Sequence, residues 1–132
     1  SPTFIFSIVA LLDLIETIPE NAHKIAAVLP VNMEVFHWHG DTFDLPEGAL
    51  QLFRSEACEN QAFAYGENII ALQFHLETTP ASLDALINNC SEELVEAPYI
   101  QSAKEMRKGT SRFQTINRNM DILLTHLFQI KR

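Results

Sequence analysis

Cysteine and glycine are scarce in this sequence. The 132 residues include two cysteines and four glycines, and neither residue type occurs before Pro30. Two cysteines, Cys58 and Cys90, cannot build a framework of several disulfides, and they do not form a C-x-x-C redox motif. This usage argues against a disulfide-stapled secreted module and favours a reducing, cytoplasmic compartment.

Positive charge is also scarce. Nine lysines and arginines stand against 17 aspartates and glutamates, which gives a formal net charge of −8. General nucleic-acid binding needs a basic surface, and so does docking on an anionic membrane, so we expect neither function. Most of the basic residues lie beyond Ala103, where we interpret them as the solvated face of a helix.

The sequence has no long hydrophobic run. The longest extends from Ile5 to Leu12, and Asp13 and Glu16 follow it closely. It is too short to cross a bilayer. No lysine or arginine precedes it, so a secretory signal is not expected either. The sequence begins with Ser1 rather than Met, and we expect that an upstream segment has been removed.

The overall composition suits one packed α/β domain. Hydrophobic residues make up 47% of the chain and charged residues 20%, which leaves enough apolar surface for a core. Runs of β-branched, aromatic and aliphatic residues predict strands at residues 3–12, 33–38, 49–54, 61–65 and 69–74. Apolar residues at helical spacing predict helices at residues 14–28 and 113–130, and a further helix that Thr79 and Pro80 open. Strands followed by helices indicate an α/β layer fold.

Residues 69–74 give the strongest strand signal. Their near-continuous apolar run predicts burial on both faces of a sheet, and His75 would lie at the carboxyl end of this strand. Residues 66–68 (GEN) predict the turn of a hairpin that joins this strand to residues 61–65.

His75 and Glu77 form the first candidate for chemistry. In extended backbone, residues two apart project to the same side. A carboxylate beside an imidazole fixes its tautomer and raises its basicity, which a general base requires. Taken alone, H-x-E is a short motif, and a strand-end histidine beside an exposed glutamate is the more ordinary interpretation.

The wider context of this motif resembles a known family. Three blocks occur in order, residues 35–46 (VFHWHGDTFDLP), residues 55–63 (SEACENQAF) and residues 71–77 (ALQFHLE). Together they resemble the class I glutamine amidotransferases, most closely the amidotransferase domain of GMP synthase and its stand-alone homologues. The resemblance covers residues 30–94 well and the two ends loosely.

This resemblance implies roles for several residues. In the family, a cysteine on a strand-to-helix elbow attacks the side-chain amide of glutamine and ammonia is released. His75 would be the general base, and Glu77 the carboxylate that orients it. His39 and Asp41 would line the glutamine pocket. Leu76 replaces a proline that many members carry, and both catalytic side chains are retained beside it.

The nucleophile of the family has no counterpart in this sequence. The family's cysteine lies upstream of the first block in a glycine-rich elbow, and this chain has neither residue type there. Cys58 lies between the motifs and Cys90 follows the histidine, so we interpret both as structural. By this hypothesis the chain alone cannot hydrolyse glutamine.

The first block also permits a metal-site interpretation. H-x-H-x-D, here His37, His39 and Asp41, opens the zinc site of metallo-β-lactamase-like hydrolases. That family continues with a histidine where this sequence has Thr42. We therefore expect neither a metal nor a cofactor, and we expect His37 to pack within the sheet.

The sequence therefore predicts an α/β, flavodoxin-like class I amidotransferase sandwich that is incomplete, consisting of the C-terminal part and a helical tail. We treat residues 1–132 as one partial domain, with the sheet in residues 1–95 and a helical extension in residues 96–132. Glutamine is the expected substrate, and an ammonia-accepting synthetase is an expected partner. Because the missing half would expose one side of the sheet, we also expect a homo-oligomer or a companion N-terminal fragment. The alternatives are a non-catalytic amidotransferase-like binding or regulatory module, and a γ-glutamyl peptidase.

Overall fold

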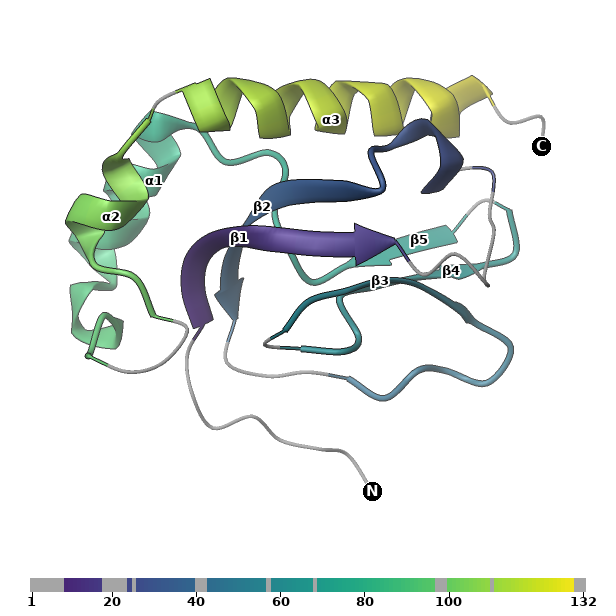
Figure 1. Cartoon of the computed structure of the whole chain (residues 1–132), viewed down its shortest axis with the longest axis horizontal. Coiled ribbons are helices and arrows are strands. Elements are labelled where there is room, and N and C mark those ends of the chain that lie inside the picture. Colours follow the sequence, from purple (N-terminus) through teal and green to yellow (C-terminus); the bar gives the residue numbers. More distant parts are fainter. Residues whose placement is uncertain are drawn as a thin grey trace.

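The computed structural model describes residues 9–17, 24, 26–39, 43–56, 58–67, 69–96, 100–109 and 111–129. Five strands and three α-helices form the described part, with two short 3-10 helices (Figure 1). In chain order the elements are β1 (Val9–Thr17), η2 (Ala26–Val28), β2 (Asn32–His39), β3 (Leu50–Arg54), β4 (Ala62–Tyr65), β5 (Ile69–Leu72), α1 (Pro80–Asn89), η3 (Ser91–Glu93), α2 (Ala103–Arg107) and α3 (Ser111–Gln129). The predicted α/β class is confirmed.

The strands form one sheet in the order β2-β1-β3-β4-β5, and each described pair is antiparallel. β1 pairs with β2 along most of its length, from Val9 opposite His39 to Glu16 opposite Asn32. The helix predicted over residues 14–28 is wrong at its start, because residues 14–17 continue β1. Pairing of this segment with two neighbouring strands overrides its local helical pattern. Residues 3–8 of the predicted first strand lie outside the described residues.

The prediction for residues 69–74 needs a correction. β5 ends at Leu72 and lies at an edge of the sheet, where it pairs with β4. Its residues are exposed or half-buried, so it is not buried on both faces as predicted. The apolar run misled because an edge strand of an antiparallel sheet keeps one side open to solvent. The hairpin itself is confirmed, and Gly66 adopts the positive φ of 66° that its turn requires.

The sheet curls so that its two edges approach each other. After β5 the chain turns, and His75 forms an isolated antiparallel bridge with Phe36 of β2, the strand at the opposite edge. β1 bends strongly along this curl (Figure 1). The site predicted from the sequence therefore lies where the sheet folds back on itself, not at the carboxyl end of a buried strand.

Helix α3 lies along one side of this curled sheet, while α1 and α2 gather at one end (Figure 1). Its buried residues include Phe113, Ile116 and Leu123, which join the core cluster formed with β2 and α1. The helix predicted for residues 113–130 is thus confirmed in substance. Its apolar stripe is wider than the buried face, because Phe128 remains 70% exposed.

The helix boundaries follow their local signals. Thr79 is the N-cap of α1, and its side chain accepts a hydrogen bond from the backbone N–H of Ser82 while the Ser82 hydroxyl accepts one from Thr79 N–H. This reciprocal capping box confirms the predicted start of the helix. Gly109 separates α2 from α3 with a φ of 67°, a conformation that costs glycine little.

Candidate active site around His75 and Glu77

The segment that carries His75 is fixed by its backbone. The His75 N–H donates to the Phe36 carbonyl at 2.7 Å, and the Phe36 N–H donates to the His75 carbonyl at 3.2 Å. Two residues earlier, the Gln73 N–H donates to the Gln61 carbonyl at 2.9 Å. These bonds hold the main chain of the segment against β2 and against the residue just before β4, and these two strands are distant from each other in the sheet order. The segment is therefore rigidly placed although it belongs to no strand.

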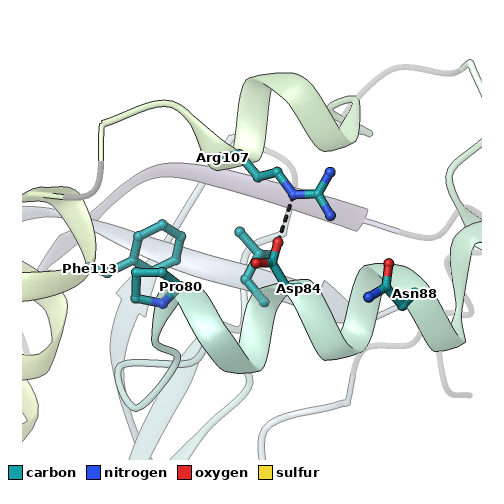
Figure 2. Close-up of a pocket in the computed structure, with 6 residues that line it drawn as sticks. Pro80, Asp84, Asn88, Arg107 and Phe113 are labelled. Carbon is teal, nitrogen blue, oxygen red and sulfur yellow. Dashed lines mark hydrogen bonds and ion pairs between the residues drawn. The ribbon is translucent and has the colours of Figure 1, made fainter.

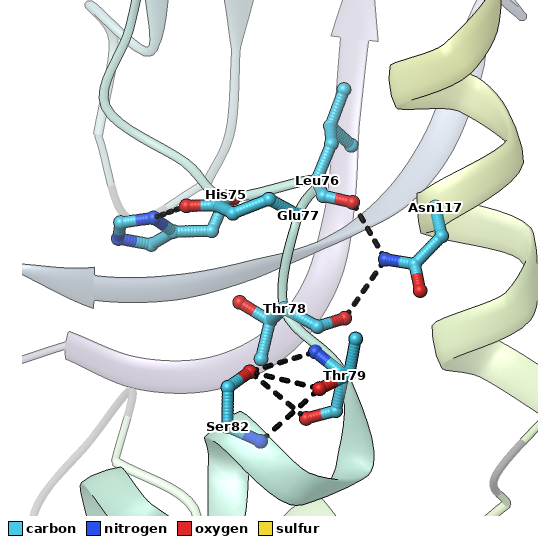
Figure 3. Close-up of polar contacts among 7 residues, drawn as sticks. All are labelled: His75, Leu76, Glu77, Thr78, Thr79, Ser82 and Asn117. Atoms are coloured by element: carbon cyan, nitrogen blue, oxygen red, sulfur yellow. Dashed lines mark hydrogen bonds and ion pairs between the residues drawn. The ribbon is translucent and has the colours of Figure 1, made fainter.

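His75 and Glu77 meet as the sequence predicts. His75 Nδ1 lies 2.7 Å from Glu77 Oε1, and the two side chains are 38% and 57% exposed (Figure 3). A carboxylate accepts hydrogen bonds only, so this contact places a proton on Nδ1 and a lone pair on Nε2 of the neutral ring. The pair is open to solvent on one side, where a substrate could approach. Such an arrangement can accept a proton from a thiol.

One polar residue near this pair is not predicted from the sequence. The side-chain amide of Asn117, on α3, donates to the carbonyls of Leu76 and Thr78, at 2.9 Å each (Figure 3). No signal in the sequence marks this contact, because both acceptors are backbone carbonyls of a remote segment. The contact becomes visible only when α3 is placed beside residues 76–78.

The histidines of β2 are in a different environment. His37 is 1% exposed, and neither ring nitrogen has a hydrogen-bond partner among the described residues. Burial lowers the pKa of His37 to about 3, with smaller contributions from His39 and His75. The His37 ring packs edge-on against Phe74, with ring centroids 6.5 Å apart. Its predicted position within the sheet is confirmed, and its ring is neutral at physiological pH.

His39 and Asp41 were predicted to line a substrate pocket. His39 ends β2 on the same face as His37, with the two ring centroids 5.8 Å apart, and it is half-buried. Asp41 lies outside the described residues. Within the described ranges, no three histidine, cysteine, aspartate or glutamate side chains are grouped as a metal site would require. Of the three residues in the zinc alternative, the structure describes only His37 and His39.

The two cysteines lie in settings that suit structural roles. Neither forms a disulfide. Cys58 is buried, and its Sγ lies 3.8 Å from the Asn60 carbonyl. Cys90 is the C-cap of α1, and partial burial together with the nearby Glu93 and Glu92 raises the pKa of its thiol. A raised thiol pKa disfavours the thiolate, which is the nucleophilic form.

A surface pocket opens between α1, α2 and the start of α3. Its volume is about 430 Å³, and the ion pair between Arg107 and Asp84, 2.7 Å long, crosses it (Figure 2). The lining residues are Pro80, Leu83, Asp84, Asn88, Arg107 and Phe113. None of His39, His75 and Glu77, the predicted site residues that the structure describes, lines this pocket. No described helix, α3 included, is both long and apolar enough to cross a membrane.

No protein-family model matches the chain. Over 88 residues it is 34% identical to the glutamine amidotransferase-like protein YfeJ of Salmonella typhimurium, a match that covers 64% of this chain and 37% of the relative. Two crystal structures of glutamine amidotransferases have similar folds. The structure from Thermotoga maritima has a TM-score of 0.80 at 29% identity, and the match covers 98% of this chain and 54% of the Thermotoga chain. The structure from Methylobacillus flagellatus has a TM-score of 0.87 at 26% identity, and the match covers 100% of this chain and 57% of the Methylobacillus chain.

The likeness extends over nearly the whole chain but over about half of each solved relative. It confirms the predicted flavodoxin-like class I amidotransferase fold and the family resemblance of the sequence.

Proposed function

We propose that this chain, which resembles class I glutamine amidotransferases in sequence and fold, carries in His75 and Glu77 the base half of a site that hydrolyses the side-chain amide of glutamine. The observation that carries the proposal is the 2.7 Å contact between His75 Nδ1 and Glu77 Oε1. Orienting an imidazole through Nδ1 leaves Nε2 as the basic atom, which is the role of the base in Cys–His–acid triads.

The proposed reaction has two steps. A cysteine thiol gives its proton to His75 Nε2, and the thiolate attacks the amide carbonyl carbon of glutamine. The C–N bond breaks, the leaving nitrogen takes the proton from His75, and ammonia departs from a thioester. Water then attacks the thioester while His75 accepts its proton. Glutamate is released, and the thiol is regenerated with the proton that His75 returns. Glu77 stabilises the imidazolium that forms in each step.

We propose that the nucleophile is neither Cys58 nor Cys90. Cys58 is buried away from solvent, and the raised pKa of Cys90 opposes thiolate formation. The reacting cysteine would therefore come from sequence corresponding to the part of the relatives that this chain does not span, supplied in the same protein or by a companion fragment. His39 and Asp41 are proposed to contact the substrate glutamine, and an ammonia-accepting synthetase is the proposed downstream partner.

The test is a comparison of two protein forms. Ammonia and glutamate release from glutamine is measured for the 132-residue chain and for the full product of its gene. Both are also treated with a glutamine analogue that carries an alkylating diazoketone, and their intact masses are determined. We expect the chain to be inert with both cysteines unmodified, and a longer product to hydrolyse glutamine and gain one adduct. An adduct on Cys58 or Cys90 would contradict the assignment of the nucleophile.

A second candidate is a non-catalytic amidotransferase-like module that binds glutamine or a synthetase without hydrolysis. The settings of Cys58 and Cys90 favour it for the chain by itself. It predicts that a full gene product without a further cysteine at the elbow binds its partner and hydrolyses no glutamine. Pull-down of the synthetase with an unreactive protein would support this candidate over the first.

A further inference from the structure

Asn117 contacts both sides of the residue that orients His75. One amide nitrogen, Nδ2, donates to the Leu76 carbonyl and to the Thr78 carbonyl, at 2.9 Å each (Figure 3). An amide NH₂ carries two hydrogens, so these two bonds use its full donor capacity. Glu77 is the residue between the two accepting carbonyls. A single side chain from α3, about forty positions away in the sequence, therefore holds the peptide unit that precedes Glu77 and the one that follows Thr78.

The placement of Glu77 depends on this main chain. Its side chain is 57% exposed, so packing does little to fix it. The side chains of Leu76 and Thr78 are buried, which sets the alternation that points Glu77 outward. On the other side of the pair, the backbone bonds between His75 and Phe36 fix the histidine. The two halves of the pair are thus anchored separately, His75 by β2 and Glu77 by α3.

We propose that Asn117 is a positioning residue, which holds the Glu77 backbone so that its carboxylate meets His75 Nδ1 and selects the Nδ1–H tautomer. The inference rests on the proposed function for its catalytic meaning. The selection of the His75 tautomer can be tested without measuring glutamine hydrolysis. Through this contact the position of α3 also sets the geometry of the pair.

The chain offers a matched control on the same helix. Asn119 is buried, and its Nδ2 faces Met33 Sδ at 3.7 Å rather than residues 76–78. Asn117→Ala and Asn119→Ala both replace an asparagine in the interior of α3 with the best helix former. A loss that comes only from disturbing α3 would appear in both variants. A loss of positioning would appear only in Asn117→Ala.

The experiment is nitrogen-15 NMR of the His75 ring in the 132-residue chain, at a pH where the neutral imidazole dominates. The ring nitrogens report which of them carries the proton. For the wild type and Asn119→Ala we expect the proton on Nδ1. For Asn117→Ala we expect the preference to be lost, with the proton shared between Nδ1 and Nε2. Asn117→Ser, which keeps one hydroxyl donor, serves as the milder variant if the alanine variant does not fold, and should lie between the two.

A second readout uses the full gene product. Asn117→Ala should lower kcat for glutamine hydrolysis by about 10- to 100-fold, because misplacement of a catalytic group has effects of this order. KM should change far less, since both donor hydrogens of the Asn117 amide bond backbone carbonyls. An unchanged His75 tautomer in the folded Asn117 variants would overturn the inference. If the tautomer shifts while the wild-type product hydrolyses no glutamine, the proposed function fails and the positioning role stands.

Discussion

Two neighbouring segments of this molecule carry histidines and hold them in opposite ways. Strand β2 buries His37 with no hydrogen-bond partner in the part of the chain that the structure describes, and burial lowers its pKa to about 3. Residues 73–79 instead leave His75 half-exposed, with Glu77 at 2.7 Å from its ring. The segments touch through the bridge between Phe36 and His75. Environment, and not residue type, separates a packing histidine from a candidate base.

The comparison also shows how each segment is fixed. β2 is held by its ladder with β1 and by the core that its side chains Met33, Val35 and Phe36 join. Residues 73–79 have no ladder, and individual hydrogen bonds to β2, to Gln61 just before β4 and to α3 replace it. Residues 73–79 can therefore expose His75 to solvent while β2, beside them, stays packed in the core. The predictions below change one segment at a time.

The largest effect is expected from removing the orienting carboxylate of the exposed pair. Glu77→Gln keeps the shape of the side chain but can present an N–H to His75 Nδ1. Glutamine hydrolysis by the full gene product should fall by about 10²- to 10⁴-fold, the range of general-base catalysis. Asp84→Asn is the control, since it removes an exposed carboxylate that pairs with Arg107 elsewhere on the surface. Equal losses in both variants would remove the special role of Glu77.

The next effect concerns the ring that joins the two segments. Phe36 is buried, and its ring centroid lies 6.2 Å from that of His75. Phe36→Ala should lower the free energy of unfolding by about 3–5 kcal/mol, from lost burial and a residual cavity. Phe128→Ala, at a position 70% exposed on α3, should change it by about 0.5 kcal/mol or less. Urea denaturation of the two variants gives both values, and similar losses would contradict the core as described.

Acid should affect the buried segment through His37. Its folded-state pKa of about 3 lies below the ordinary histidine pKa of 6.5, so the unfolded chain takes up this proton first. The stability that depends on the neutral ring is complete above pH 6.5 and is lost as the pH falls toward 3. The loss should be roughly 1 kcal/mol per pH unit across this window.

His37→Phe is the matched variant for this prediction, because it keeps an aromatic ring and removes the titration. Urea denaturation at several pH values should show a shallower acid loss for His37→Phe than for the wild type. Carboxylates that titrate in the same range contribute equally to both proteins and cancel in the difference. Parallel pH profiles would show that His37 is protonated in the folded protein without penalty.

The smallest effect is expected where residues 73–79 lead into α1. Thr79→Ala removes the side-chain acceptor for the Ser82 N–H and should cost about 1 kcal/mol of stability. Thr115→Ala is the control, since its hydroxyl bonds the Ser111 carbonyl within α3 and caps no helix. Thermal unfolding should rank Thr79→Ala below Thr115→Ala. The reverse order would argue against the capping box.

The elements predicted well are those whose signals are local. Thr79 and Pro80 start α1, Gly66 turns the β4–β5 hairpin, and the apolar spacing from Ile116 onward marks α3. The contact between His75 and Glu77 was also predicted, because it needs only extended backbone and a spacing of two. In each case the cause lies within a few residues of its effect.

The predictions that failed depend on distant partners. Residues 14–17 became strand because β2 and β3 pair with them, and β5 lies at an edge because of the strand order. The bridge between His75 and Phe36 depends on the curl of the whole sheet. Asn117 gave no signal at all, since its two acceptors are backbone carbonyls of a remote segment. Hydrophobic pattern alone encodes none of these pairings.

The most direct test of the central claim is the glutaminase activity of the full gene product with His75 replaced. His75→Asn retains a polar side chain at an exposed position, so the fold should persist, as circular dichroism and thermal unfolding would verify. We predict a loss of glutamine hydrolysis of about 10²-fold or more, with alkylation by the diazoketone analogue slowed in parallel. Full activity in a folded His75→Asn protein would contradict the account, because another group would then have to serve as the base.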